Sequence, residues 1–266
     1  MAFVLLVVTL AGCGRGDEHG EAVRLSGATM ATTWNVTYVE PVTAPVPEDI
    51  HAGIQAALDA VNTSMSTYLP DSEISRFNND QPLHEPFAVS RSFAAVIKAA
   101  LLVGAATNGA YDITVGPLVD LWGFGATDNV IEPPTGAAIA AARERVGQHA
   151  LRLEDSGQLV KRTPVALDVS SLAKGYAVDA VAEWLAAQGL VDYLVEVGGE
   201  MRLAGHSPRG GPWRVAIEQP SAGLRTVAGA ILLSDVAVAT SGDYRNFFEA
   251  DGKRYSHMID PRTGYP

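Results

Sequence analysis

Apolar residues recur along the chain with two different periods, and each period predicts one type of secondary structure. Residues 29–39 alternate between apolar and polar side chains, which indicates a strand with one buried face. Residues 48–66 repeat apolar side chains every three or four positions, which indicates a helix. Further helices are predicted after Ser90, ending at Asn108-Gly109, and after Thr135, over residues 136–147.

The middle of the chain predicts a strand, a helix and a second strand in succession. Residues 165–169 form a short apolar run with β-branched side chains, and residues 191–197 form another. Between them, apolar residues repeat at helical spacing, with Ser170 or Ser171 available as the helix N-cap and Gly189 as its stop. This unit carries the clearest candidate chemistry of the chain.

Most of the closing third of the chain predicts strands. They are expected over residues 201–204, 213–218, 228–233 and 236–240, with a last hairpin around Asp251-Gly252 whose second strand, 255–259, contains His257. A shorter hairpin is expected over residues 151–160. Because helices and strands do not alternate regularly, the pattern predicts an α+β fold rather than a doubly wound parallel sheet.

Composition and charge narrow the function classes. A length of 266 residues fits one large domain or two small ones, and 47% hydrophobic residues can fill a sizeable core. The formal net charge of −11 argues against nucleic-acid binding, which needs clustered basic residues. The glycine-rich phosphate-binding patterns of dinucleotide-binding and P-loop proteins are absent from the sequence.

The single cysteine, Cys13, rules out an intramolecular disulfide and follows an apolar stretch. Residues 2–12 are too few to span a membrane and end in small residues before Cys13, as in bacterial lipoprotein signals. We therefore expect a signal peptide over residues 1–12, a lipidated Cys13, a flexible tether over 13–26, and a lipid-anchored protein on the periplasmic side of the cell membrane. The alternative is an apolar first strand with an accidental cysteine.

The start of the predicted central helix combines features that attract an anion. Its free backbone N–H groups carry partial positive charge, and Lys174 adds a full charge in the first turn. Asp168, at the end of the preceding strand, can bind a polar ligand group or pair locally with Lys174. The spacing alone leaves a ligand site and a structural ion pair open.

Three further residues have both a structural and a functional interpretation. Met30 can fill the core at the start of its strand. Tyr68, before the turn signal Pro70-Asp71, can pack or can stack on a planar ligand. His257 can be a structural residue of its strand or a catalyst.

Seven stretches, in this order, resemble the ApbE family of bacterial flavin transferases. They cover most of residues 27–266 and read TMATTW, STYLPDSEISRFN, AYDITVGPLVDLWGFG, ALDVSSLAKGYAVD, YLVEVGGEM, PWRVAIEQP and ATSGDYRNFFEADGKRYSHMIDPRTGYP. The resemblance implies a T-fold-like α+β architecture with mixed or antiparallel sheets and packed helices. It also implies Mg²⁺-dependent transfer of the FMN half of FAD to a Thr or Ser hydroxyl of a target protein, with release of AMP.

The resemblance implies partners as well as an activity. Family targets are subunits of membrane redox complexes such as the sodium-pumping quinone reductase and its Rnf relatives. An FAD-binding periplasmic lipoprotein without transfer, and an FAD pyrophosphatase that releases FMN and AMP to water, remain the alternatives.

The family's site residues can be carried over to matching positions of this sequence. The resemblance implies that His257 assists the transfer and that Ser171 supplies an oxygen ligand to Mg²⁺. It implies FAD contacts from Met30, Tyr68, Ala110, Tyr111, Asp112, Asp168, Lys174 and Ile259. The family continues beyond Pro266 with a segment that completes the metal site, so we expect a C-terminally truncated domain that binds FAD and Mg²⁺ weakly.

Overall fold

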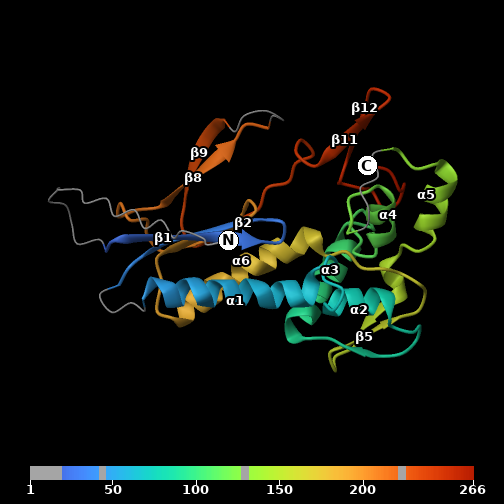
Figure 1. The fold of residues 1–266 in the computed structure, drawn as a ribbon, viewed down its shortest axis with the longest axis horizontal. Coiled ribbons are helices and arrows are strands. Elements are labelled where there is room, and N and C mark those ends of the chain that lie inside the picture. Colours follow the sequence, from blue (N-terminus) through green and yellow to red (C-terminus); the bar gives the residue numbers. More distant parts are fainter. Residues whose placement is uncertain (1–19, 42–45, 127–131, 221–225) are drawn as a thin grey trace, which may run out of the picture.

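A five-stranded antiparallel sheet forms the central layer of the computed structural model, which describes residues 20–41, 46–126, 132–220 and 226–266. Its strand order is β1-β2-β6-β7-β10, spanning Ala22–Thr29, Thr32–Val39, Tyr193–Val197, Glu200–Ala204 and Val236–Val238. The helices α1 (Pro47–Met65) and α6 (Ser170–Ala187) pack against each other along one face of this sheet (Figure 1). The expected α+β class is confirmed.

The main core lies between this sheet and the two helices, where both sequence periods bury their apolar residues. On β2 the alternation places Trp34, Val36 and Tyr38 on the inner face, each at most 1% exposed. Helical spacing brings the apolar face of α1 opposite them, with Ile50, Ile54, Leu58, Val61 and Met65 buried. Burying one such side chain contributes roughly 1.5–3 kcal/mol, so this layer supplies much of the folding free energy.

Smaller elements surround the central layers. The helices α2 to α5 span Glu73–Asn79, Arg91–Ala106, Gly116–Leu121 and Gly136–Arg143, and the 3₁₀ helix η1 spans Gln148–Ala150. A small sheet has the order β3-β5-β4, formed by Phe87–Ala88, Gln158–Lys161 and Leu151–Leu153. Two hairpins complete the fold, β8–β9 (Trp213–Glu218, Val227–Leu233) and β11–β12 (Phe247–Ala250, Lys253–Ser256).

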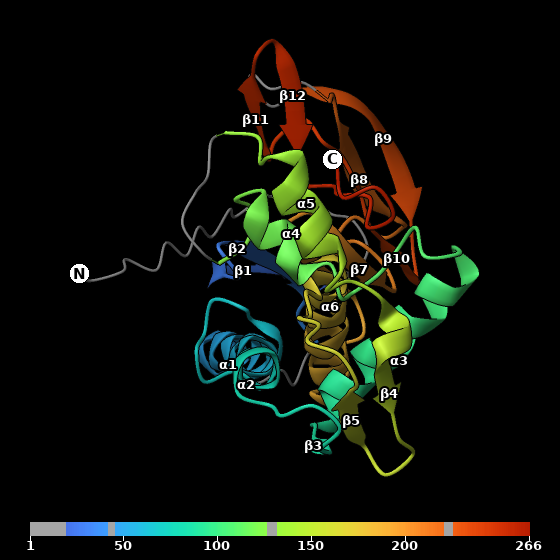
Figure 2. The same cartoon turned by 90° about the vertical axis from the view of Figure 1, so that its right-hand side faces the viewer.

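The β8–β9 hairpin packs on the sheet face that the long helices leave free (Figure 2). Its buried residues Trp213 and Val215 form a cluster with Leu203 of β7, and Leu194 and Met201 pack against them. The protein therefore has helices on one side of the central sheet and a β hairpin over part of the other.

The first hairpin differs from the prediction. Residues 22–26, expected in a tether, begin β1, and the strand expected over 29–39 begins only at Thr32. A two-residue turn, Met30-Ala31, joins the strands with φ values of 49° and 56°. Such a turn normally contains Asn or Gly, so Met30-Ala31 carries no local signal for it.

The start of α6 also differs from the prediction. Residues 165–169 do not form a ladder strand, and Ala166 makes one parallel bridge to Val115. Neither Ser170 nor Ser171 is the N-cap: that position is Val169, whose own side chain makes no capping hydrogen bond. Instead, the Asp168 carboxylate accepts a hydrogen bond from the Ser170 amide at 2.8 Å.

Other boundaries follow or shorten the predicted ones. Ser90 and Thr135 cap α3 and α5 by accepting from the amides of Phe93 and Ala138, as expected. The helix α5 ends at Arg143 instead of 147, and β12 ends before His257. The helices α2 and α4 fall in stretches that the pattern assigns to turns and loops, because each is less than two turns long.

The described ranges contain no helix that is long and apolar enough to cross a membrane. The expected signal peptide, Cys13 and the tether up to residue 19 lie outside those ranges. The lipid anchor therefore stays a prediction.

Gly53→Ala is expected to lower the free energy of unfolding by about 1–3 kcal/mol, although Ala is the better helix former. A Cβ at Gly53 of α1 would overlap the indole ring of Trp184 on α6. Gly175→Ala in α6 is the matched control, because a Cβ there meets nothing within 4 Å, and it should stabilise by about 0.5–1 kcal/mol. Urea unfolding measures both, and equal signs would contradict the close packing of α1 on α6.

Candidate active site

Two hairpin turns and the first turn of α6 meet at one end of the central sheet. The Gly198 amide, in the β6–β7 turn, donates to the Thr33 carbonyl at 3.1 Å. A Cβ on Gly198 would lie 2.9 Å from Thr32 Cγ2 and 3.1 Å from Lys174 Cδ. With φ at 58°, Gly198 thus permits a close approach that a side chain would prevent. Lys174 lies against this turn, beside the Met30-Ala31 turn.

The segment before α6 is held by a side chain far away in sequence. The Asn78 amide at the end of α2 donates to the Leu167 carbonyl at 2.9 Å and accepts from its N–H at 2.7 Å. Next along the chain, the Asp168 amide donates to the Ile113 carbonyl at 2.8 Å. Sequence reasoning missed Asn78, since a single asparagine gives no signal of a partner 89 positions away.

Asp168 and Lys174, both in the described chain, do not form the local ion pair that the spacing allowed. Asp168 binds the Ser170 amide instead, at the N-terminal end of α6. Lys174 is half-buried, and the carboxylate that its charge influences most clearly is Glu200 of β7. Its ammonium group therefore remains available to an anion at the helix end.

Glu200 is an additional charged residue of this site that sequence reasoning did not single out. Its Oε2 atom is buried without a hydrogen-bond partner among the described residues. Burial raises the pKa of Glu200, and the nearby charge of Lys174 opposes that rise. The neighbouring Glu196 is better satisfied, because it accepts from Asn35 Nδ2 and from the Gly199 amide, both at 2.6 Å.

Tyr111 and Ser171 bring the loop before α4 to the start of α6. Their hydroxyl oxygens are 2.9 Å apart. Burial raises the pKa of Tyr111, and the charges of Asp168 and Asp112 add to the rise while the hydrogen bond to Ser171 opposes it. Tyr111 therefore stays protonated, and when it donates to Ser171 the serine oxygen keeps its lone pairs for another partner.

Asp112 has a structural function in the same loop. One carboxylate oxygen accepts from the Thr114 amide at 2.8 Å and from its hydroxyl at 2.6 Å, and the other accepts from the Gln148 amide at 2.9 Å. These bonds fix the loop that presents Ala110 and Tyr111. The FAD contacts of Asp112 and of the exposed Ala110 stay predictions.

The other predicted residues lie around residues 122–125. The Tyr68 side chain is mostly exposed, and its hydroxyl donates to the Gly125 carbonyl at 3.3 Å. The exposed His257 ring lies 6.4 Å from the Phe124 ring, centroid to centroid. Ile259 packs against the adjoining cluster of Leu118, Trp122, Ile139 and Ala142. These residues form an aromatic surface rather than a charged one.

Asp120 of α4 connects the charged and the aromatic groups. Burial raises the pKa of its carboxyl, and the charge of Asp168 raises it further, whereas Arg145 opposes the shift. Asp120 is thus electrostatically coupled to the start of α6 while its helix packs into the aromatic cluster. The sequence-predicted residues therefore form two groups that adjoin through α4.

The described residues offer a metal ion only part of a ligand set. Across the described ranges, no three His, Cys, Asp or Glu side chains are close enough together to hold one. Mg²⁺ in nucleotide enzymes is often bound by one or two carboxylates, waters and the phosphates themselves. Ser171, with Asp168 three residues earlier, fits such a partial set.

Glu200→Gln is expected to stabilise the protein at pH 7 but not at about pH 4. Burial raises the pKa of Glu200 above its ordinary value of 4.5, so the folded state holds this proton more tightly than the unfolded state. Wild-type stability therefore falls as pH rises from 4.5 through the raised pKa, and a neutral Gln avoids that loss. Urea unfolding at both pH values measures the difference. The exposed Glu85→Gln is the control, and the same pH effect there would contradict this account.

Sequence and structure comparisons agree on the family of this chain. The ApbE family model matches residues 30–266. A curated FAD:protein FMN transferase of Vibrio cholerae is 46% identical over 261 residues, which cover 98% of this chain and 77% of that protein. One from Haemophilus influenzae is 42% identical, over 99% of this chain and 77% of that protein.

Solved structures give the same result at the level of the fold. The flavin transferase ApbE from Vibrio cholerae superposes with a TM-score of 0.85 at 45% identity, over 92% of this chain and 78% of that one. The ApbE protein of Thermotoga maritima superposes with a TM-score of 0.83 at 29% identity, over 92% of this chain and 78% of that one. With this fold and these identities, the chain belongs to the ApbE family.

Proposed function

We propose that this protein transfers the FMN half of FAD to a Thr or Ser hydroxyl of an acceptor protein and releases AMP. The relatives named FAD:protein FMN transferase support this activity. The observation that carries the proposal is the position of Lys174 near the N-terminal end of α6. The aliphatic part of its side chain lies against Gly198 of the β6–β7 turn. Its ammonium group is not neutralised by Asp168, so it is available for phosphate.

The start of α6 suits the pyrophosphate of FAD. The helix end and Lys174 both offer positive potential where negative charge develops as a hydroxyl attacks phosphorus. Asp168 accepts the hydrogen bond of the Ser170 amide. The side of α6 on which Lys174 lies is therefore left for the ligand. Glu200 beside Lys174 limits the net charge of the site and can orient the ammonium group.

Ser171 and Asp168 would hold Mg²⁺ together with phosphate oxygens of the nucleotide. When bound, the ion supplies positive charge that neutralises the phosphates and polarises phosphorus. Tyr111 then has a positioning function, because its hydroxyl at 2.9 Å orients that of Ser171.

The aromatic surface around residues 122–125 suits the flavin or adenine ring. The mostly exposed ring of Tyr68 can stack on a planar ligand. We assign FAD contacts to Met30, Tyr68, Ala110, Tyr111, Asp112, Asp168, Lys174 and Ile259, the residues that the family resemblance implies.

His257 is the candidate base for the acceptor hydroxyl. Its Nδ1 lies 3.1 Å from the Asn246 carbonyl, which can only accept a hydrogen bond. This contact favours the tautomer with hydrogen on Nδ1 and leaves the Nε2 lone pair free. The exposed ring can then take the hydroxyl proton through Nε2 as the new phosphoester bond forms.

The cellular setting follows from the first residues of the sequence. We propose lipidation at Cys13, an anchor in the cell membrane on its periplasmic side, and an acceptor that is a subunit of a sodium-pumping quinone reductase or an Rnf-like complex. The apolar stretch before Cys13 supports the anchor. An anchored enzyme would act on acceptors held at the same membrane surface.

The proposed activity predicts a covalent adduct. The chain is incubated with saturating FAD, Mg²⁺ and a purified acceptor domain, and mass spectrometry should find an FMN-sized adduct on its Thr together with equimolar AMP. EDTA, or Ala in place of the acceptor Thr, should abolish the adduct. Free FMN and AMP without an adduct would instead identify a pyrophosphatase, and bound, intact FAD a binding protein.

Lys174→Gln should slow the transfer by about 10²–10³-fold, because the site loses a positively charged side chain near the phosphates. Lys98→Gln, exposed on α3, is the matched control and should be unaffected.

His257→Ala should slow the transfer by about 10²–10⁴-fold with FAD affinity retained. The rates are measured as the amount of adduct formed in samples quenched at successive times. An unchanged rate in His257→Ala would move the base to another residue.

A further inference from the structure

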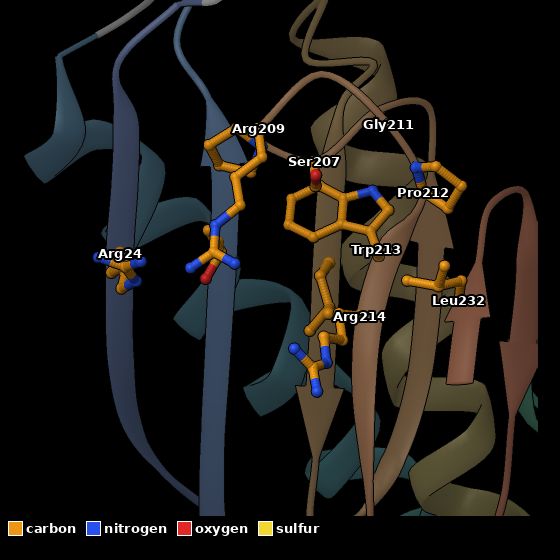
Figure 3. A pocket seen from close by; sticks show the side chains of 11 residues that line it. Arg24, Ser207, Arg209, Gly211, Pro212, Trp213, Arg214 and Leu232 are labelled. Carbon is orange, nitrogen blue, oxygen red and sulfur yellow. The ribbon is translucent and has the colours of Figure 1, made fainter. Parts of the chain in front are cut away.

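A groove of about 560 Å³ lies away from Lys174, on the sheet face opposite α1 and α6 (Figure 3). One wall consists of Arg24 on β1, Thr37 on β2 and Leu194 on β6, which are neighbours in the strand register. The other consists of residues 207–214, with Leu232 of β9 at the rim.

The groove concentrates positive charge in an acidic protein. Three arginines line it, Arg24, Arg209 and Arg214, and its lining contains no acidic side chain. None of the three pairs with an acid among the described residues, whereas Arg152, Arg202, Arg245, Arg254 and Arg262 each do. At a net charge of −11, three unneutralised arginines around one groove indicate a site for an anionic partner.

The wall that carries Arg209 and Arg214 is preformed. The Ser207 amide donates to the Gly211 carbonyl at 2.7 Å, and the Gly210 amide donates back to Ser207 at 2.8 Å. Trp213 is 4% exposed, and its Nε1 donates to the Ala204 carbonyl of β7 at 2.8 Å. Binding of a partner would therefore cost little conformational entropy in this wall.

An open polar track connects the groove with the site. On the outer face of β1–β2 the cross-strand pairs are Arg24 with Thr37, Ser26 with Asn35, and Ala28 with Thr33, ending at the Met30-Ala31 turn. Most of these side chains are exposed, and all beyond Arg24 are small or uncharged. Arg24 precedes Met30 by six positions, or about 20 Å of strand.

We propose that the groove binds an acidic stretch of the acceptor polypeptide, and that the extended chain runs from there along β1–β2 to the site. This inference rests on the proposed transfer to protein. The acidic residues would lie about six positions from the accepting Thr, the number that spans 20 Å. A peptide fits better than a membrane surface, because the arginines line a groove between the sheet and residues 207–214, which an extended chain can enter and a flat layer of lipid headgroups cannot.

The test replaces all three groove arginines together, in Arg24→Gln/Arg209→Gln/Arg214→Gln. The KM for the acceptor domain should rise about tenfold and lose most of its salt dependence, with kcat and FAD affinity unchanged. Arg91→Gln/Lys98→Gln/Arg162→Gln, which removes three positive charges at exposed positions outside the groove, is the matched control. An unchanged KM in the triple variant would overturn the inference even where the adduct forms normally.

A binding measurement keeps the test independent of transfer. Fluorescence anisotropy compares an acceptor peptide carrying Asp residues about six positions from its Thr with the same peptide carrying Asn. The wild type should prefer the Asp peptide about tenfold, and the triple variant should not. Equal binding of both peptides by the wild type would overturn the inference. So would arginine-dependent binding to phosphatidylglycerol vesicles without preference for the Asp peptide, which would identify a membrane contact.

Discussion

The site depends on where α6 begins, and two hydrogen bonds from one side chain fix that point. Asn78 binds both the N–H and the carbonyl of Leu167, and the next amide binds Ile113. Each such bond contributes only about 0.5–1.5 kcal/mol to stability, but together they leave the backbone before α6 no freedom to shift. Lys174 follows within two helical turns. Its position against the β6–β7 turn therefore depends on the hydrogen bonds by which Asn78, at the end of α2, holds the segment before α6.

The charged side chains around the start of α6 are mostly carboxylates. Carboxylates surround the start of α6, and the pKa values of Tyr111 and Asp120 are raised by burial first and by these charges in addition. Lys174 and Arg145 are cations near them, and the half-buried Glu200 accompanies Lys174 from β7. These carboxylates offset part of the positive potential of Lys174 and the helix end, which gives a physical reason for a nucleotide to bring a divalent cation with it.

Strong local signals were readable from the sequence. Alternation on β2 and helical spacing on α1 predicted the central layers, and the caps Ser90 and Thr135 predicted the starts of α3 and α5, because each signal depends on neighbours within a few residues. The Met30-Ala31 turn and the Asp168 bond to Ser170 were missed, since the residues normally used there are different. Asn78 and Glu200 could not be found locally, because their function arises from contacts across the fold. The family resemblance, by contrast, named candidate site residues without their geometry.

The turn between β1 and β2, at the end of the sheet that carries the candidate site, has a strained backbone. Met30 and Ala31 both adopt left-handed backbone conformations, which cost a non-glycine residue roughly 1–2 kcal/mol each. Asn-Gly would relieve that strain and join the same strands. The Met30 side chain, which packs against the main core, would then be lost. A sequence selected only for thermal resistance would thus drift away from methionine here, and this turn is a position where substitution can raise folding stability at the cost of the packing that Met30 supplies.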